Sequence, residues 1–260
     1  MKCTPIQPDL SQFPAEFHSL LTSPVFDSSC SPEARVCYIH KDQGYFLKSA
    51  PAGSLRKEAA MDRFFCEKGM GPQVLSYFTT DRDWLLTLRV AGEDCLHAQY
   101  LSDPQRLCDT TALLLRQLHE TPIEGCPVPN RTADYIATAM ENYRTGHYDA
   151  TLFPDNWGYA SAEEAIAVVW EFAPALQSDT LLHGDYCLPN ILLQDWKRSG
   201  FIDLGSGGVG DRHIDLFWGV WSLFFNLKTD AWCDRFLDVY GRDKIDKDIL
   251  GAIGAFEVFG

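Results

Sequence analysis

The chain has 260 residues, of which 46% are hydrophobic and 22% charged, and its formal net charge is −14. This length supports one large or two modest domains with a real hydrophobic core, and the composition is ordinary for a globular protein. The negative charge disfavours nucleic acid and anionic membranes as partners, because both attract Lys and Arg. It is compatible with a cationic small-molecule substrate, although acidity can also serve solubility alone.

The cysteines argue for a reducing compartment. There are nine, an odd number, at scattered positions and without a CxxC pair. This disfavours both a zinc ribbon and a disulfide framework. The first residues are interrupted by Pro5 and Pro8, so no signal peptide is visible, and the apolar stretch 216–227 is too short to span a bilayer. We therefore expect a cytoplasmic protein that does not bind membranes.

The first third of the chain predicts a small antiparallel sheet. A short helix is expected within 11–21, followed by a Ser-rich turn. Alternating apolar patterns then predict strands at 35–39, 45–48, 74–78 and 84–88. Ser54 is expected to cap a helix between the second and third of these strands, which Gly69 would end.

The rest of the chain is mainly helical in pattern. Apolar residues recur at helical spacing, with Asp103-Pro104 at the first helix start and a capping box at Ser161 and Glu164. Helices are expected over about 104–118, 132–143, 161–172, 216–227, 230–240 and 247–256. A strand, a loop at 194–200 and a returning strand interrupt them.

Four polar residues flank that hairpin. The order is His183-Gly184-Asp185, then Asn190, then Asp203-Leu204-Gly205. An antiparallel hairpin folds its ends together, so Asn190 and Asp203 should lie side by side. Phosphoryl transfer needs a carboxylate for the attacking hydroxyl, which we assign to Asp185, and oxygen ligands for Mg²⁺, which we assign to Asn190 and Asp203. Either triplet alone would be read as an ordinary turn.

These residues resemble the motifs of the aminoglycoside phosphotransferase family, and most closely those of its 3′-phosphotransferases. The resemblance rests on His183 to Asp185, Asn190 and Ile202 to Gly205, followed by Asp211 and Asp215. It implies an α+β, bilobal, protein-kinase-like fold. The expected parts are an N-lobe at 1–88 with a small antiparallel sheet, a hinge at 89–93 and a mainly helical C-lobe at 94–260.

Several site roles follow from that resemblance or are supported by it. Lys48, at a strand end, would bind the nucleotide phosphates, with Glu58 as its partner, although a lysine at a strand end is usually a surface residue. The resemblance adds Ser29 and Ser31 to the nucleotide site and the hinge residues Leu88 and Val90 to the adenine site. His183 and Asp215 are expected to support the catalytic loop rather than to react, since a carboxylate at a helix start also favours capping.

A polyamine substrate requires a carboxylate-rich pocket. Asp155 and Glu163 are candidates from an acidic stretch that could equally be a solvated face. Glu257 lies in a segment similar to the acidic, Phe-containing end that aminoglycoside 3′-kinases place in the sugar pocket.

The expected function is ATP- and Mg²⁺-dependent phosphorylation of an aminoglycoside hydroxyl, at the 3′ position. The alternatives are a kinase of another small amine or sugar, similar to choline or homoserine kinases, and a non-catalytic nucleotide-binding regulator. The sequence leaves the oligomeric state open.

Overall fold

The computed structural model describes residues 4–30, 32, 34–148 and 158–260. Its contacts divide the chain into two compact units. Unit 1 comprises Met1–Cys95 and Pro189–Gly205, and unit 2 comprises Leu96–Leu188 and Ser206–Gly260. Within the described ranges, no helix has the length and apolar character required to cross a membrane.

Unit 1 is built on an antiparallel sheet. Its described residues form six strands in the order β1-β2-β3-β4-β6-β5. The four strands expected from sequence are confirmed, whereas β1 and β2 were missed because each has only three residues. The strands are β1 (Thr4–Ile6), β2 (Val25–Asp27), β3 (Arg35–Ile39), β4 (Tyr45–Pro51), β5 (Val74–Thr79) and β6 (Arg82–Leu88).

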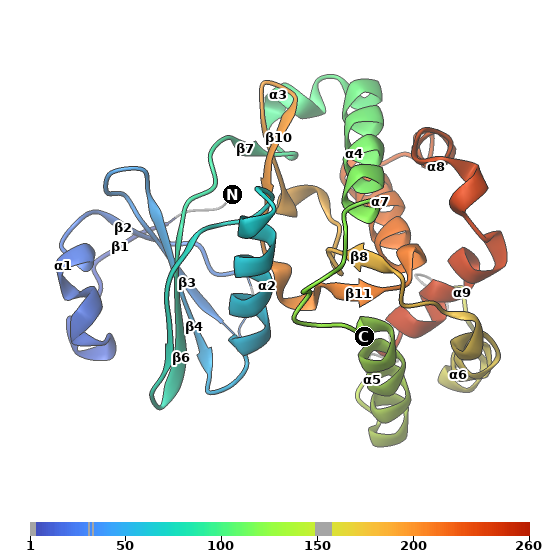
Figure 1. Cartoon of the computed structure of the whole chain (residues 1–260), viewed down its shortest axis with the longest axis horizontal. Helices are drawn as coiled ribbons and strands as arrows, with labels where there is room; N and C mark the ends of the chain where they lie inside the picture. The colour runs from blue at the N-terminus through green and yellow to red at the C-terminus, as the bar shows by residue number, and fades with distance from the viewer. Residues whose placement is uncertain (1–3, 31, 33, 149–157) are drawn as a thin grey trace. The chain divides into compact units, whose positions relative to one another are not determined.

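The two faces of this sheet pack against different layers. Leu86 joins a cluster with Phe13 and Phe17, whose segment carries the short helices η1 (Leu10–Gln12), η2 (Ala15–Phe17) and α1 (His18–Leu21). Its neighbour Leu85 points to the opposite face and packs with Leu55 and Ala59 beside helix α2 (Arg56–Glu67). Figure 1 shows α2 lying along the sheet.

Helix α2 begins in a way that the sequence did not reveal. The expected cap, Ser54, instead donates its hydroxyl hydrogen bond to the Pro51 carbonyl at 2.6 Å. The N-cap residue is Leu55, whose side chain makes no capping bond. Its backbone N–H donates to Oδ2 of Asp83 at 2.8 Å, so a carboxylate from β6 satisfies the helix start.

A smaller sheet completes unit 1. It has the order β10-β9-β7 and contains β7 (Glu93–Asp94), β9 (Ile191–Gln194) and β10 (Lys197–Phe201). The loop expected at 194–200 is wrong: β9 and β10 are joined by a two-residue turn in which Asp195 and Trp196 have positive φ. Because β9 pairs with β7, residues 189–205 belong to unit 1, although they fall inside the chain range 94–260 expected for the C-lobe. The lobe and hinge boundaries themselves remain a prediction.

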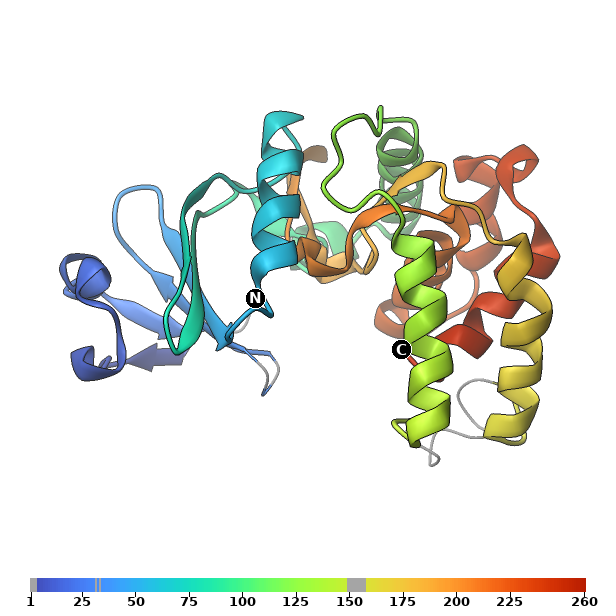
Figure 2. The ribbon, with the colours of Figure 1, turned by 60° about the horizontal axis from the view of Figure 1, so that its bottom comes forward.

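Unit 2 is mainly helical, as expected. A two-stranded pair, β8 (Thr180–Leu182) and β11 (Gly208–Gly210), lies among its helices, and Figure 2 shows α5 and α6 running side by side. The core is centred on residues such as Ile166, Ile253 and Phe256. The helices are α3 (Ala98–Leu101), α4 (Pro104–His119), α5 (Arg131–Thr145), α6 (Ala162–Phe172), α7 (Arg212–Leu227), α8 (Cys233–Tyr240) and α9 (Lys247–Glu257).

Candidate active site

Lys48 in β4 lies at the centre of a charged cluster in unit 1. Its Nζ contacts both carboxylate oxygens of Glu58 in α2, at 2.9 and 2.8 Å. The same Nζ contacts Oδ1 of Asp203 at 3.1 Å. Strand β4 is paired on both sides, with Val36 and Leu85 opposite Lys48, so the lysine stem is fixed. The cluster therefore joins β4 and the next element, α2, to Asp203, which lies 155 residues after Lys48.

The electrostatics of this cluster favour a charged Lys48. Burial by itself lowers the pKa of the ammonium, but the charges of Glu58 and Asp203 outweigh it and the net pKa is raised. Two carboxylates face this one ammonium, which leaves surplus negative charge. A divalent cation would compensate that surplus.

A third carboxylate, Asp62, lies one helical turn after Glu58 and was missed by sequence reasoning. It is 2% exposed, and its Oδ1 has no hydrogen-bond partner among the described residues. Burial, followed by the charge of Glu58, raises its pKa well above the ordinary value. The i,i+4 spacing of two acidic residues on a helix with an apolar face was the one available signal.

The β9–β10 hairpin positions the two expected metal ligands. Ile191 pairs with Phe201, and the Ile202 N–H donates to the Asn190 carbonyl at 3.1 Å. Asp203 follows directly and has a φ of +60°, a left-handed conformation that non-glycine residues rarely adopt. Its side chain is 54% exposed, so it remains accessible to a ligand. A strained, accessible carboxylate at the end of a strand is typical of a functional position.

The donor set fits Mg²⁺ better than a metal held by protein alone. In the described ranges there is no group of three or more His, Cys, Asp or Glu side chains arranged to hold a metal ion. Mg²⁺ usually takes one or two protein carboxylates and completes its octahedron with phosphate oxygens and water. Asp203 and Asn190 would supply such a minimal set.

In unit 2, the loop that carries His183 and Asp185 is held by Asp215 of α7. The Asp215 carboxylate accepts the His183 N–H through Oδ2 and the Gly184 N–H through Oδ1, both at 2.7 Å. His183 and Asp215 are both fully buried. The Asp185 N–H donates to Nδ1 of His183 at 3.2 Å. Asp215 therefore holds the backbone of this loop in place. Asp211 has a different role, because it caps α7 by accepting the His213 N–H.

Asp215 has a further partner that the sequence did not indicate. Nε2 of His119, at the end of α4, lies 3.2 Å from Oδ2 of Asp215, and Nδ1 lies 2.8 Å from the Tyr240 hydroxyl. Burial lowers the pKa of His119, so its ring is neutral at physiological pH. A carboxylate oxygen accepts hydrogen bonds, which assigns the single ring proton to Nε2 and makes Nδ1 the acceptor of the Tyr240 O–H. A lone histidine at a helix end gives no sequence signal for this role.

Gly184 is required by the packing of the same loop. Its φ is +84°, and a Cβ at this position would lie 2.0 Å from the Ser206 carbonyl oxygen. That carbonyl also accepts a hydrogen bond from Nε of Arg131 at 2.8 Å. Burial raises the pKa of the nearby Cys187 thiol, so this cysteine is not an activated nucleophile.

Glu257, at the end of α9, lies where α5, α7 and α9 meet. Its Oε1 accepts the Tyr135 hydroxyl at 2.6 Å and the Trp218 indole N–H at 3.1 Å. Its Oε2 has no hydrogen-bond partner in the described part of the chain. Burial raises the pKa of Glu257 to about 7, and the charge of Asp185 contributes to the rise. The carboxylate is thus held in place by two hydrogen bonds to one of its oxygens.

The chain is similar to known proteins along most of its length. The sequence profile of the phosphotransferase enzyme family (APH) matches residues 32–250. The chain is 45% identical over 254 residues to a probable aminoglycoside 3′-phosphotransferase of Lactococcus lactis subsp. lactis (strain IL1403), with 97% of each chain covered. It is 30% identical over 209 residues to an aminoglycoside 3′-phosphotransferase of Niallia circulans, covering 78% of this chain and 79% of the relative.

The chain belongs to the phosphotransferase enzyme family. Its fold also resembles the structure of the aminoglycoside phosphotransferase APH(3'')-Id from Streptomyces rimosus ATCC10970, which contains ADP and streptomycin. That similarity has a TM-score of 0.72 at 22% identity and covers 86% of this chain and 90% of the other. The expected protein-kinase-like fold is confirmed.

The remaining predicted nucleotide-site residues of this family member have varied surroundings. The Ser29 hydroxyl donates to Oδ1 of Asp27 at 2.7 Å and accepts the Val36 N–H at 2.9 Å, so it holds its own loop together. Ser31 lies outside the described residues. Leu88 ends β6, where its N–H donates to the Gln73 carbonyl at 2.9 Å. Val90 packs against Gly200 of the hairpin, where an added Cβ would lie 2.9 Å from Val90 Cγ1.

The two other predicted substrate residues receive less support from the geometry. Glu163 is exposed in the first turn of α6, where its own backbone N–H and Ser161 lower its pKa. This describes a helix-capping carboxylate. Asp155 lies outside the described residues.

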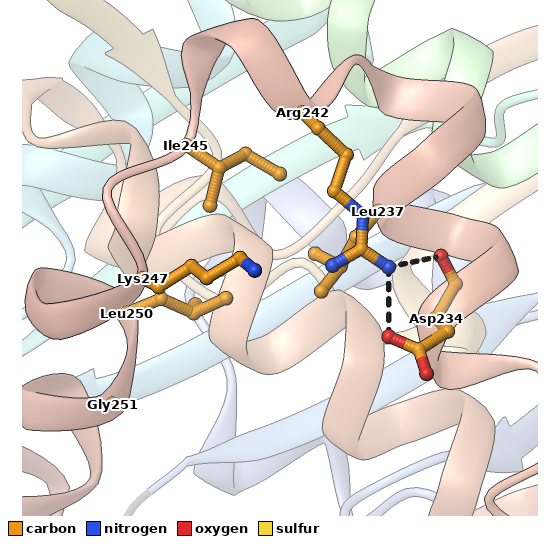
Figure 3. A pocket seen from close by; sticks show the side chains of 7 residues that line it. All are labelled: Asp234, Leu237, Arg242, Ile245, Lys247, Leu250 and Gly251. Carbon is orange, nitrogen blue, oxygen red and sulfur yellow. Dashed lines mark hydrogen bonds and ion pairs between the residues drawn. The ribbon is translucent and has the colours of Figure 1, made fainter.

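A surface hollow in unit 2 has a different character from these positions. It measures about 400 Å³ and lies between α8 and α9 (Figure 3). Its Arg242 head group already contacts Oδ1 of Asp234 at 2.7 Å and Oδ1 of Asp238 at 2.6 Å. No predicted site residue lines it; the lining residues are Asp234, Leu237, Arg242, Ile245, Lys247, Leu250 and Gly251.

Proposed function

We propose that this enzyme transfers the γ-phosphoryl group of ATP to the 3′-hydroxyl of an aminoglycoside, and that it thereby confers resistance to such antibiotics. The observation that carries the phosphotransfer chemistry is the contact of Lys48 with both Glu58 and Asp203. An ammonium held between a helix glutamate and an accessible aspartate is the arrangement that a kinase uses to bind a metal–triphosphate.

The substrate class is supported by the relatives. Both bacterial sequences at 45% and 30% identity are named as aminoglycoside 3′-phosphotransferases, the first as a probable one. The net charge of −14 suits a polycationic substrate, and Glu257 places a carboxylate where α5, α7 and α9 meet in unit 2. We place the activity in the cytoplasm, where ATP is available.

The proposed reaction assigns each residue one task. Lys48 binds the α- and β-phosphates, and Glu58 holds its ammonium in place. Asn190 and Asp203 would hold Mg²⁺, which would supply positive charge against the phosphates. Asp185 orients the substrate hydroxyl and accepts its proton late in transfer. A new bond forms from the hydroxyl oxygen to the γ-phosphorus as the bond to the β-bridging oxygen breaks, and ADP leaves.

An ADP-release assay with ATP and Mg²⁺ tests this assignment. The panel contains kanamycin, neamine, neomycin B, choline and homoserine. We expect turnover with the aminoglycosides and none with the two metabolites. Turnover with choline or homoserine alone would identify a metabolite kinase instead, and nucleotide binding without any turnover would identify a non-catalytic regulator.

Two variants separate the proposed roles. Asp185→Ala should lose roughly 100- to 10,000-fold in kcat because the proton acceptor is removed, while calorimetry should show unchanged affinity for a non-hydrolysable ATP analogue. Lys48→Ala should mainly raise KM for ATP. Full turnover by Asp185→Ala would contradict the role of that carboxylate.

A further inference from the structure

Arg131, the first residue of α5, makes two contacts with different parts of unit 2. Its Nε donates a hydrogen bond to the Ser206 carbonyl at 2.8 Å. The central carbon of its guanidinium, Cζ, lies 5.5 Å from the centroid of the Tyr135 ring, within the range of a cation–π contact. Arg131 and Tyr135 are one helical turn apart, so both lie on the same side of α5. The guanidinium thus joins a backbone carbonyl to an aromatic ring.

The first contact leads to the catalytic loop. The Ser206 carbonyl oxygen lies so close to Gly184 that an added Cβ would be 2.0 Å from it. Gly184 immediately precedes Asp185, the proposed proton acceptor. Backbone atoms in such close contact cannot move independently. A shift of the Ser206 carbonyl would therefore also shift the backbone that carries the Asp185 side chain.

The second contact leads to the proposed substrate carboxylate. The Tyr135 ring stacks on Phe256, with 5.3 Å between centroids and 15° between the ring planes. Its hydroxyl donates to Oε1 of Glu257 at 2.6 Å. Arg131, Phe256 and Glu257 therefore all restrict the position of this ring. Loss of the guanidinium would remove one of the three restraints on the group that holds Glu257.

The position of Arg131 in its helix argues against a role confined to α5. A cation in the first turn of a helix is disfavoured by the helix dipole. The start of α5 is already satisfied by Asn130, whose side chain accepts the Ala133 N–H. The stem of Arg131 lies instead against β11, where a Cβ added to Gly208 would be 3.0 Å from its own Cβ. These contacts direct the side chain away from its helix.

The charge of Arg131 also acts on Glu257. Burial raises the pKa of Glu257 to about 7, whereas the hydrogen bonds from Tyr135 and Trp218 and the charge of Arg131 oppose this rise. The charge of Asp185 adds to it. The ionisable groups that act on Glu257 are thus Arg131 and Tyr135 of α5 and Asp185 of the catalytic loop. Arg131 is the cation of this set.

We propose that Arg131 is a positioning residue for phosphotransfer, which couples the backbone next to Asp185 to the carboxylate of Glu257 through Ser206 and Tyr135. This inference rests on the proposed function. The guanidinium fixes the orientation of Asp185 toward the substrate hydroxyl and, at the same time, the position of the Glu257 side chain. Its charge keeps Glu257 ionised at a lower pH than the buried site would otherwise allow.

The test compares Arg131→Met and Arg131→Lys with the control Arg144→Met. Arg144 lies on the same helix, but its side chain is 71% exposed and pairs with Glu141 three residues earlier. Methionine keeps an unbranched apolar stem and removes both the charge and the Nε–H. Lysine keeps the charge but loses the planar guanidinium. Thermal melting and circular dichroism verify that each variant is folded.

Steady-state kinetics with ATP and kanamycin measure both parts of the role. Arg131→Met should lower kcat roughly 10-fold or more, because the orientation of Asp185 is lost. It should also move the midpoint of the pH profile of KM for kanamycin upward by about 0.5 or more. Arg131→Lys should lower kcat less than methionine does and keep this midpoint within about 0.3 of the wild-type value. Arg144→Met should change neither quantity.

Carbon-13 NMR of labelled glutamate carboxyl groups follows the ionisation of Glu257 without any turnover. The Glu257→Gln variant identifies the resonance. We expect a higher midpoint of this titration in Arg131→Met than in the wild-type protein, and an unchanged midpoint in Arg144→Met.

A positioning role and a purely structural role give different results. Reduced thermal stability of Arg131→Met with unchanged kcat and unchanged pH midpoints would overturn the inference, as would equal behaviour of Arg131→Met and Arg144→Met. If Arg131→Met does not fold, a reduced kcat in Arg131→Lys supports the role and a wild-type kcat overturns it. If the wild-type protein turns over no aminoglycoside, the proposed function fails, and the NMR titration still decides whether Arg131 acts on Glu257.

Discussion

The charged side chains of the site differ in how many hydrogen-bond or ion-pair partners the fold gives them. Lys48 has two carboxylate partners, whereas the buried Oδ1 of Asp62 has none among the described residues. Glu257 is fixed by Tyr135 and Trp218 but keeps a raised pKa. The uncompensated groups are the ones whose ionisation should be measurable in solution.

Asp62 should reduce stability at neutral pH. Its pKa in the folded protein is raised well above the ordinary value of 3.8. Below pH 3.8, Asp62 is protonated in both the folded and the unfolded protein, so it does not lower the free energy of unfolding. As the pH rises above 3.8, Asp62 loses its proton more readily in the unfolded protein than in the folded one. The free energy of unfolding therefore decreases. Asp62→Asn should therefore increase the free energy of unfolding by on the order of 1–3 kcal/mol at pH 8 and by less at pH 5.

Urea unfolding at the two pH values measures this difference. Glu67→Gln is the control, since it removes an exposed carboxylate from the same helix and should change stability by less than about 0.5 kcal/mol. A gain for Asp62→Asn that does not grow with pH would show that ionisation of Asp62 is not the cause.

Glu257 should make substrate binding depend on pH. Its pKa is raised to about 7, mainly by burial, so it is largely protonated at pH 6 and ionised at pH 8. A cationic substrate favours the ionised form, and KM for an aminoglycoside should therefore rise as pH falls from 8 to 6. Glu257→Gln should raise KM at pH 8 and lack this part of the pH dependence, as steady-state kinetics would show. KM for ATP is the internal control, and an unchanged aminoglycoside pH profile in Glu257→Gln would exclude Glu257 as the titrating group.

At the scale of elements, the catalytic loop is held by backbone contacts that depend on one glycine and one helix. Asp215 of α7 accepts both the His183 and Gly184 N–H groups, and His119 of α4 contacts the same carboxylate. The loop, two helices and Tyr240 of α8 thus form one buried polar network. Each member of the network is a hydrogen-bond partner of another member. We therefore expect the network to lose more than one hydrogen bond when any member is substituted.

Gly184→Ala should disrupt this loop. The substitution combines a φ of +84° with a Cβ placed 2.0 Å from the Ser206 carbonyl oxygen. Backbone must move, so we expect a loss of at least about 3 kcal/mol in the free energy of unfolding, together with loss of turnover. Gly125→Ala is matched in conformation, with a φ of +79°, but an added Cβ meets nothing within 4 Å. It should cost only about 1–2 kcal/mol.

Denaturant unfolding and kcat are measured for both variants. The comparison separates the effect of backbone strain at positive φ from the effect of the steric contact with Ser206. Similar losses for the two alanines would show that φ alone matters and that contact with Ser206 does not.

At the scale of the whole molecule, the dominant property is charge. With 36 acidic and 22 Lys and Arg residues, the chain should attract polycations over distances beyond direct contact. This attraction acts on encounter rather than on chemistry. It does not depend on any one of the substrate-pocket residues.

Salt should therefore lower kcat/KM for an aminoglycoside. Raising ionic strength from about 10 mM to about 100 mM shortens the screening length from about 30 Å to about 10 Å. We expect kcat/KM for neomycin B to fall roughly 3- to 10-fold, while kcat at saturation stays constant. The corresponding value for anionic ATP should not fall in parallel. Equal decreases for both substrates would point to a general salt effect on the enzyme instead.

Much of this protein followed from sequence because its signals are local. The alternating apolar patterns identified β3, β4, β5 and β6, and the spacing from His183 to Asp203 pointed to phosphotransfer. The pairing of Asn190 with the end of β10 followed from hairpin geometry alone. The errors lay in very short strands and helices, in a two-residue turn, and in where α2 and α7 begin.

Only the tertiary structure could reveal contacts between distant segments. Nothing local indicates that Asp83 would satisfy the start of α2, that His119 would contact Asp215, or that Glu257 would be fixed by Tyr135 and Trp218. Burial of Asp62 and exposure of Phe225 are likewise properties of packing, because the same residue types occur both inside and outside folded proteins. Sequence determined which chemistry is present, and the fold decided which groups share an environment, since pKa values and ligand contacts depend on neighbours in space.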